Sequence, residues 1–159
     1  MLHTKLLSFI LIIFSTTLMA AEFPKTPDLA VTPGSLCHSP DQYRYPERIP
    51  YCKRDVSSDT KKDVFAEYRR LGFTLNIKNN RDDYKIDHFI PLCAGGSNDE
   101  SNLWPQHKSV FELTDPLESV GCEKLKDGKI KQAKLIEMIK AAKTNLAQVP
   151  NTLKFLENL

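Results

Sequence analysis

Residues 84–106 have the sequence YKIDHFIPLCAGGSNDESNLWPQ, and they say more about the fold than any other part of the chain. Apolar residues flank Asp87 and His88, so a short strand at 84–86 leading into a turn would fix these two polar side chains on a rigid element. The polar, glycine-containing residues 94–101 predict a loop, and residues 102–104 predict a second short strand. The segment therefore predicts a hairpin.

Asp87 and His88 combine two groups that phosphodiester hydrolysis needs. A carboxylate oxygen suits a hard divalent cation, and a neutral imidazole can take a proton from water near neutral pH. Asn102 could hydrogen-bond the loop backbone and hold His88 in place, while Gly95 and Gly96 let the loop bend. Each feature alone is more often a surface or core detail than part of a site, but chance explains their combination poorly.

These residues resemble a known family. The runs that begin at Asp87 (DHFIPL), Gly95 (GGSN) and Asn102 (NLWPQ) closely resemble the HNH endonucleases, and most of all the small exported bacterial and phage members with an Asn-Leu-Trp-Pro signature. The resemblance implies a ββα-metal fold, in which two short strands and a helix clasp one divalent ion. It also implies that Asp87 is a metal ligand, that His88 is the general base, and that Asn102 orients the site.

The chain departs from the family pattern at the helix-borne metal ligand. That ligand, a His or Asn, normally follows the Asn by about nine residues, but position 111 is Phe, which cannot bind a metal. Glu112 and His107 are the nearest replacements and the ones we favour, and Asp115 and Glu118 lie further along. The other interpretation of each is a solvent-facing helix residue. The implied cofactor is one divalent ion, with Mg²⁺ favoured over Mn²⁺, Ca²⁺ or Zn²⁺.

The first twenty residues predict a secretory signal peptide. Lys5 gives a positive start, an apolar run follows, and Ala20 and Ala21 offer small residues for cleavage. The run is shorter than the roughly 20 apolar residues that a membrane-spanning helix requires. We therefore expect export to the periplasm or the outside, and no membrane association of the mature protein.

All four cysteines lie after this segment, which favours two disulfides in an oxidising compartment. A structural zinc site is a weaker alternative, because no Cys-x-x-Cys pair is present. Sequence alone leaves three pairings open. We favour Cys37–Cys52 and Cys93–Cys122, which close the two shortest separate loops.

The charge balance limits how the chain can contact nucleic acid. The net charge is +2, and removing residues 1–20, which hold Lys5 and no acid, leaves 2 − 1 = +1. This excludes a strongly basic protein that coats nucleic acid, so any phosphate contact must be local. Each basic cluster, taken singly, is typical of a solvated helix face. The clusters are Lys53–Arg54, Lys61–Lys62, Arg69–Arg70, and the lysines at 124, 126, 129, 131 and 134.

The predicted fold class is α+β: a small, mainly helical domain around a ββα-metal motif, braced by disulfides. Thr60 and Asp63 have the spacing of a capping box before the first helix. The predicted organisation is an irregular segment at 21–58, a nuclease domain at 59–144 with helices at 59–71, 107–126 and 130–144, and a C-terminal tail at 145–159. Pro116 marks a point where the second helix could break.

The predicted function is a secreted or periplasmic metal-dependent endonuclease of little sequence specificity, a monomer acting on nucleic acid, with DNA favoured. One alternative is a non-catalytic module on the same scaffold that binds nucleic acid or protein, which Phe111 keeps open. Another is a secreted hydrolase of small phosphodiesters, which the near-neutral charge allows. A purely structural domain ranks last.

Overall fold

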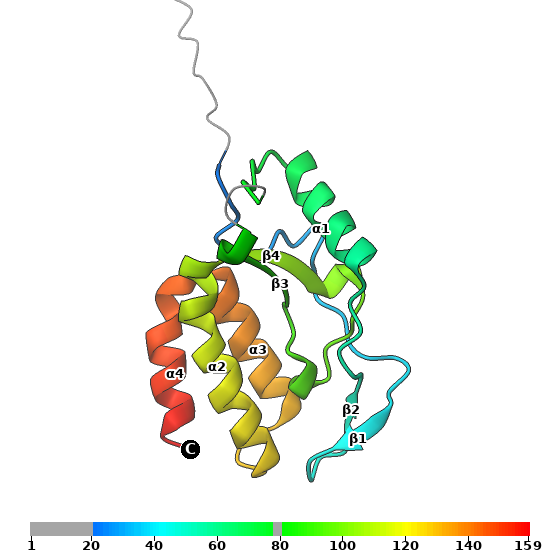
Figure 1. Cartoon of the computed structure of the whole chain (residues 1–159). Helices are drawn as coiled ribbons and strands as arrows, with labels where there is room; N and C mark the ends of the chain where they lie inside the picture. Colours follow the sequence, from blue (N-terminus) through cyan, green and yellow to red (C-terminus); the bar gives the residue numbers. More distant parts are fainter. Residues whose placement is uncertain (1–20, 78–80) are drawn as a thin grey trace, which may run out of the picture.

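The computed structural model describes residues 21–77 and 81–159, so the expected signal peptide over 1–20 lies outside the described residues. The described part is α+β, as predicted, with four α-helices and two small antiparallel sheets. Figure 1 shows the central hairpin with α1 on one side and the three other helices on the opposite side. Among the described residues, no helix has the length and apolar character needed to cross a membrane.

The predicted hairpin is present and is longer than expected. Strand β3 (Tyr84–His88) pairs antiparallel with β4 (Leu103–His107), and α2 (Lys108–Lys126) follows directly. The register places Asp87 opposite Trp104 and His88 opposite Leu103. Strand β3 thus extends two residues beyond its predicted end at residue 86, which brings Asp87 and His88 inside the ladder.

The two faces of the hairpin have different neighbours. Side chains alternate between faces along a strand, and residues paired across a ladder share a face. Lys85 and Asp87 therefore share one face with their partners Gln106 and Trp104, and Lys85 contacts Asp115 of α2 from it. The other face carries three β3 side chains, and its apolar members pack in a core cluster with α1. These side chains are Tyr84, Ile86 and His88.

Helix α1 (Ser58–Arg70) matches the predicted 59–71, but its cap differs from the prediction. Ser57 is the N-cap, and its hydroxyl accepts a hydrogen bond from the Thr60 amide at 3.0 Å. The predicted capping box at Thr60 and Asp63 is wrong, because the helix already includes Thr60. Val64, Phe65 and Tyr68 form the buried side.

Helices α2, α3 (Gln132–Thr144) and α4 (Val149–Glu157) pack into the second core cluster. Helix α2 continues through Pro116, so the break that this proline permits does not occur. Pro116 is exposed, so water can reach the neighbouring carbonyl that its missing N–H leaves unpaired. Helix α4 occupies the tail, for which the sequence predicted no element.

The N-terminal segment is more regular than predicted. Residues 21–58 contain the hairpin of β1 (Gln42–Arg44) and β2 (Ile49–Tyr51). Its turn places Tyr45 and Arg48 at φ values of 65° and 57°. Neither residue is typical of a left-handed turn, which explains why the sequence did not reveal it.

Both predicted disulfides are present. Cys37–Cys52 closes the β1–β2 region, and Cys93–Cys122 ties the segment after β3 to α2, each with a Cα–Cα distance of 5.7 Å. Further bonds hold the N-terminal segment on the loop after β3: the Cys37 amide donates to the Gly95 carbonyl at 2.8 Å. The loop that follows Asp87 and His88 is therefore fixed from two sides.

Candidate functional site

Asn102 braces the loop between the strands. It is fully buried, and its Oδ1 accepts a hydrogen bond from the Ile90 amide at 2.8 Å. Its Nδ2 donates to the Ile90 carbonyl at 3.0 Å and to the Ser97 carbonyl at 2.9 Å. A side chain at Gly96 would collide with the Ile90 carbonyl, so the loop needs glycine there. These bonds are the kind expected of Asn102 from the sequence, and its part in catalysis stays a prediction.

His88 is buried, with 2% of its surface exposed, and its tautomer follows from its partner. Its Nε2 lies 3.1 Å from Asn98 Oδ1. The other end of that amide, Nδ2, donates to the Lys53 carbonyl at 2.8 Å, so it is the acceptor oxygen that faces the ring. Nε2 must therefore carry the proton, and Nδ1 holds the free lone pair.

The His88 ring is neutral at neutral pH. Burial lowers the pKa of His88 to about 4, against the opposing effect of the hydrogen bond that the ring donates to Asn98. A neutral ring with a free lone pair has the protonation state that a general base requires.

Asp87 belongs to a cluster of three carboxylates. Asp115 and Glu118, which lie three residues apart on α2, bring one oxygen each to within 4.8 Å of one another and of an Asp87 oxygen. The i,i+3 spacing places both on the side of α2 that faces the hairpin. Three convergent carboxylates could hold a hard divalent cation.

Two lysines already contact these carboxylates. Lys143 of α3 is fully buried, and its Nζ donates to Glu118 at 2.5 Å, to the His88 carbonyl at 2.6 Å and to Asp87 at 3.4 Å. Lys85 donates to both oxygens of Asp115, at 2.6 and 2.9 Å. With every group ionised, the cluster carries 2 − 3 = −1.

Burial and the lysines set the protonation of this cluster. Although burial opposes the effect, Lys143 and Lys85 lower the pKa of Asp87. Burial raises the pKa of Glu118 to about 7, against the opposing charge of Lys143. Asp87 is therefore an ionised carboxylate at neutral pH, whereas Glu118 can exchange a proton there.

The structure does not bring Glu112 or His107 to Asp87. Glu112 is exposed on α2. His107 pairs with Tyr84 at the other end of the hairpin from His88, stacks on Phe23 at a centroid distance of 4.0 Å and hydrogen-bonds Ser109. Tyr84, which pairs with His107, lies four positions from His88 on β3, and four positions correspond to about 13 Å. The two more distant candidates, Asp115 and Glu118, are the ones that lie beside Asp87, and metal binding by any of these residues stays a prediction.

Sequence reasoning missed Lys143, although a signal was present. Lys143 follows the buried Leu135 and Ile139 at intervals of four residues, which places it on the apolar face of α3. A lysine at such a position needs a partner. The sequence does not reveal that the partners lie on β3 and α2.

Asp87 and His88 point to opposite faces of β3, with the outer edge of the strand between them. Within the described part of the chain, β3 pairs with β4 alone, so this edge is free for other groups. Arg54 donates through Nη2 to the Ile86 carbonyl at 3.0 Å, and Lys143 donates to the His88 carbonyl. Two cationic side chains thus lie along the edge that separates the imidazole from the carboxylates.

Two buried polar atoms near the carboxylates lack a partner among the described residues. They are Trp104 Nε1 and Gln106 Oε1, which lie on the strand directly opposite Asp87 and Lys85. Buried polar atoms are usually hydrogen-bonded. The face that carries Asp87 therefore retains one donor and one acceptor that a bound water or ligand could satisfy.

Comparisons with family models, with curated proteins and with solved structures find no match to this chain.

Proposed function

We propose that the protein is an exported, metal-dependent endonuclease that hydrolyses nucleic-acid phosphodiester bonds with little sequence specificity and favours DNA. The observation that carries the proposal is the arrangement of His88: a buried, neutral imidazole of defined tautomer, next in sequence to a carboxylate in a three-carboxylate cluster. The resemblance of residues 84–106 to the HNH endonucleases supports the same conclusion.

In this proposal, His88 takes a proton from the attacking water at Nδ1. The ring cannot turn freely, because Nε2–H is held by Asn98 and the loop behind it is held by Asn102. Burial and the charge of Arg54 disfavour the resulting imidazolium, whereas the negative charge of Asp87 favours it. A positioned base of this kind typically contributes about 10² to 10⁴ in rate.

The donor set at Asp87, Asp115 and Glu118 fits a hard divalent cation, with Mg²⁺ favoured. Such an ion would stabilise the negative charge that develops on the phosphate and the leaving oxygen. The Lys85 side chain is 33% exposed, so it can move out to solvent when Asp115 binds the cation. Lys143 is enclosed and stays within the site.

The outer edge of β3 is where the scissile phosphate would reach both groups. The carboxylates lie on one face of the strand and the imidazole on the other, so only a ligand at the edge can approach the two together. Arg54 and Lys143 place positive charge there, and a phosphodiester is the anion that this charge would attract.

The specific observation that favours a second function is the pairing of Lys143 and Lys85 with the carboxylates. If these ion pairs serve only to hold α2 and α3 on the hairpin, the protein would be a non-catalytic module that binds nucleic acid or a protein partner. That alternative predicts affinity for nucleic acid without cleavage.

Cleavage of a supercoiled plasmid tests the proposal. We expect the wild-type protein to nick the plasmid with Mg²⁺ and to lose this activity with a chelator, because the carboxylates then lack their cation. Asp87→Ala should abolish nicking, whereas Asp127→Ala, an acid at the end of α2, should retain it. Nicking that survives both the chelator and Asp87→Ala would refute the proposal, and binding without any nicking would favour the second function.

The setting outside the cytosol is part of the proposal. Two disulfides and no free cysteine among the described residues fit an oxidising compartment. The predicted signal peptide supplies the route.

A further inference from the structure

Three adjoining hollows form a groove beside α1. The first, of about 400 Å³, lies along α1 and includes Lys61, Phe65 and Arg69 in its lining. The second, of about 380 Å³, shares Lys61 and Phe65 with the first and adds Arg54. The third, of about 390 Å³, shares Arg54 and reaches Lys53 and Asn98. Neighbouring hollows share lining residues and therefore adjoin one another, and we call the three together the basic groove.

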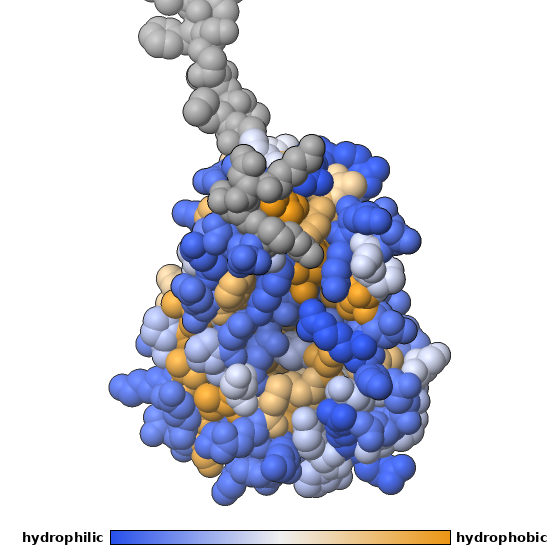
Figure 2. All heavy atoms as spheres, viewed as in Figure 1, coloured by the Kyte–Doolittle hydropathy of each residue, from blue (hydrophilic) through white to orange (hydrophobic). Residues whose placement is uncertain are grey.

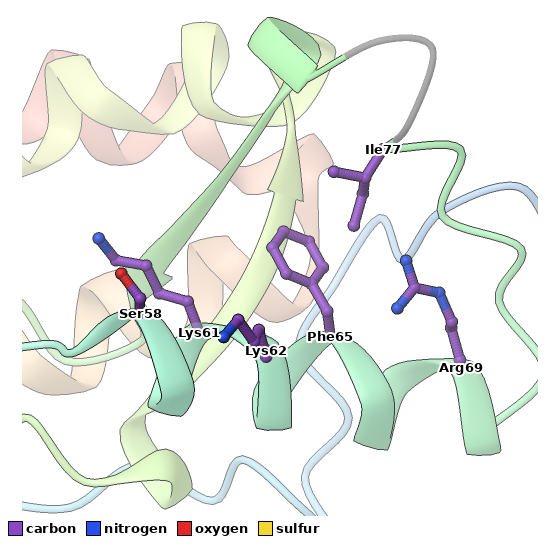
Figure 3. A pocket seen from close by; sticks show the side chains of 6 residues that line it. All are labelled: Ser58, Lys61, Lys62, Phe65, Arg69 and Ile77. Carbon is purple, nitrogen blue, oxygen red and sulfur yellow. The ribbon is translucent and has the colours of Figure 1, made fainter.

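The groove gathers basic residues that are far apart in the sequence. Lys61, Phe65 and Arg69 recur at intervals of four residues on one side of α1, and Figure 3 shows them with Ile77 across from Phe65. Lys53 and Arg54 come from the segment before the helix. Hydrophilic side chains cover most of the face seen in Figure 2, with apolar residues between them.

Several of these cations are available for a ligand. Among the described residues, no salt bridge involves Lys53, Lys61 or Arg69. By contrast, Asp59 already holds the Lys62 ammonium at 2.8 Å. Aspartates also line the groove, and the basic side chains outnumber them six to three. The aspartates are Asp41, Asp55 and Asp82.

One end of the basic groove reaches the candidate base. Asn98 lines the third hollow, and its Oδ1 accepts the hydrogen bond from His88 Nε2. Arg54 lines the second and third hollows and is bonded to the outer edge of β3. A chain of anions that starts at this edge would pass Arg54, then Lys61, and reach Arg69.

We propose that the basic groove binds the phosphate backbone of the substrate strand on one side of the scissile bond. This inference rests on the proposed nuclease function and identifies which of the basic faces holds nucleic acid. Lys61 and Arg69 are eight residues apart on α1, which is about 12 Å along the helix axis. That length matches the axial rise of three to four nucleotides of one strand, so the groove has room for a short run of phosphates.

Binding of a labelled oligonucleotide in the presence of a chelator tests the groove without depending on catalysis. The variant Lys61→Gln/Arg69→Gln removes two exposed or half-buried charges. The matched control, Lys126→Gln/Lys129→Gln, removes two charges at the turn between α2 and α3, at the opposite end of the molecule (Figure 1). Both variants lose the same net charge. Single- and double-stranded probes are measured over a range of salt concentrations.

We expect the groove variant to lose roughly tenfold in affinity per charge at moderate salt and to lower the salt slope by about one per charge. The control should bind within about twofold of wild type, because a distant charge acts weakly through screening. If wild type binds and the groove variant binds equally well, the groove inference is overturned and the nuclease proposal is untouched. If wild type binds neither probe, both are overturned.

A small phosphodiester separates binding from chemistry. Bis(p-nitrophenyl) phosphate has no flanking phosphates, so the groove variant should hydrolyse it at the wild-type rate while losing activity on long DNA. An equal loss on both substrates would show that these residues act on the reacting group, contrary to the inference.

Discussion

Asn102 and His88 show how much single side chains decide in this protein. Asn102 satisfies three backbone groups of one loop, and His88 depends on that loop for the position of its partner Asn98. Both are almost fully buried. Changes at these positions should therefore alter stability and geometry together.

Asn102→Ala should destabilise the protein by roughly 2 to 4 kcal/mol, because it leaves buried backbone groups without partners. Chemical denaturation in a chelator measures the loss. The control is Asn151→Ala on α4, where the side chain is exposed, and it should change the free energy of unfolding by less than about 0.5 kcal/mol. Equal stability of the two variants would contradict the bracing role.

The buried His88 should make stability fall in acid. Its pKa is about 4 in the folded protein and 6.5 in the unfolded chain, so the unfolded chain binds more protons between these values. The contribution of His88 to the free energy of unfolding is complete above pH 6.5. It is lost as the pH falls towards 4, and the loss amounts to at most about 3 kcal/mol.

Comparison with His88→Ala isolates this effect, since Glu118, whose raised pKa acts in the opposite sense, is present in both proteins. Unfolding free energies measured from neutral pH to pH 4 should decline more steeply for wild type than for the variant. Parallel curves would show that the ring is not held neutral by burial.

At the scale of elements, Lys143 connects three of them: it lies on α3 and contacts β3 and α2. These contacts fix helix α3 behind the candidate site. The same lysine is the cationic partner of Asp87 and Glu118. The same contacts explain why the site cannot be understood from the hairpin alone.

Lys143→Met should cost about 3 to 5 kcal/mol, because it leaves Asp87 and Glu118 in a buried site without their cation. If the carboxylates bind Mg²⁺, added Mg²⁺ should restore much of this loss and stabilise wild type less. Thermal unfolding with and without Mg²⁺ measures both effects, and Lys154→Met, an exposed lysine of α4, is the control. No difference in the Mg²⁺ response between Lys143→Met and wild type would argue against a cation among these carboxylates.

The elements were predictable where periodicity and spacing are local. The predicted helix at 59–71 lies within one residue of α1, and the apolar residues flanking Asp87 and His88 together with the glycine-containing loop gave the hairpin. The β1–β2 turn escaped, because Tyr45 and Arg48 adopt left-handed conformations that glycine usually marks. The proximity of Asp115 and Glu118 to Asp87 was not predicted either, because the angle at which α2 packs on the hairpin is a tertiary property.

At the scale of the whole molecule, two disulfides cross-link separate segments of the chain. Cys37–Cys52 encloses the small N-terminal hairpin, and Cys93–Cys122 links the loop after β3 to α2. Both loops are of moderate length, with sequence separations of 15 and 29 residues. The pairing could be predicted because it closes the two shortest separate loops.

Replacing either cysteine pair by serines should lower stability by about 3 kcal/mol, since each cross-link restricts the unfolded chain. The Cys93–Cys122 variant should in addition lose activity, because that disulfide holds the loop behind His88 against α2. Denaturation curves and plasmid nicking of the two variants measure these effects. If both variants kept full activity, the disulfides would be bracing the molecule without positioning the site.

The rate of DNA cleavage by His88→Ala is the most direct test of the central claim, that a buried neutral imidazole beside a carboxylate cluster activates water. The measurement compares wild type and folded His88→Ala at neutral pH with saturating Mg²⁺ and excess enzyme. We predict that the variant binds DNA as wild type does and cleaves it at least about a hundredfold more slowly. Equal cleavage rates, or no cleavage by either protein, would contradict the account.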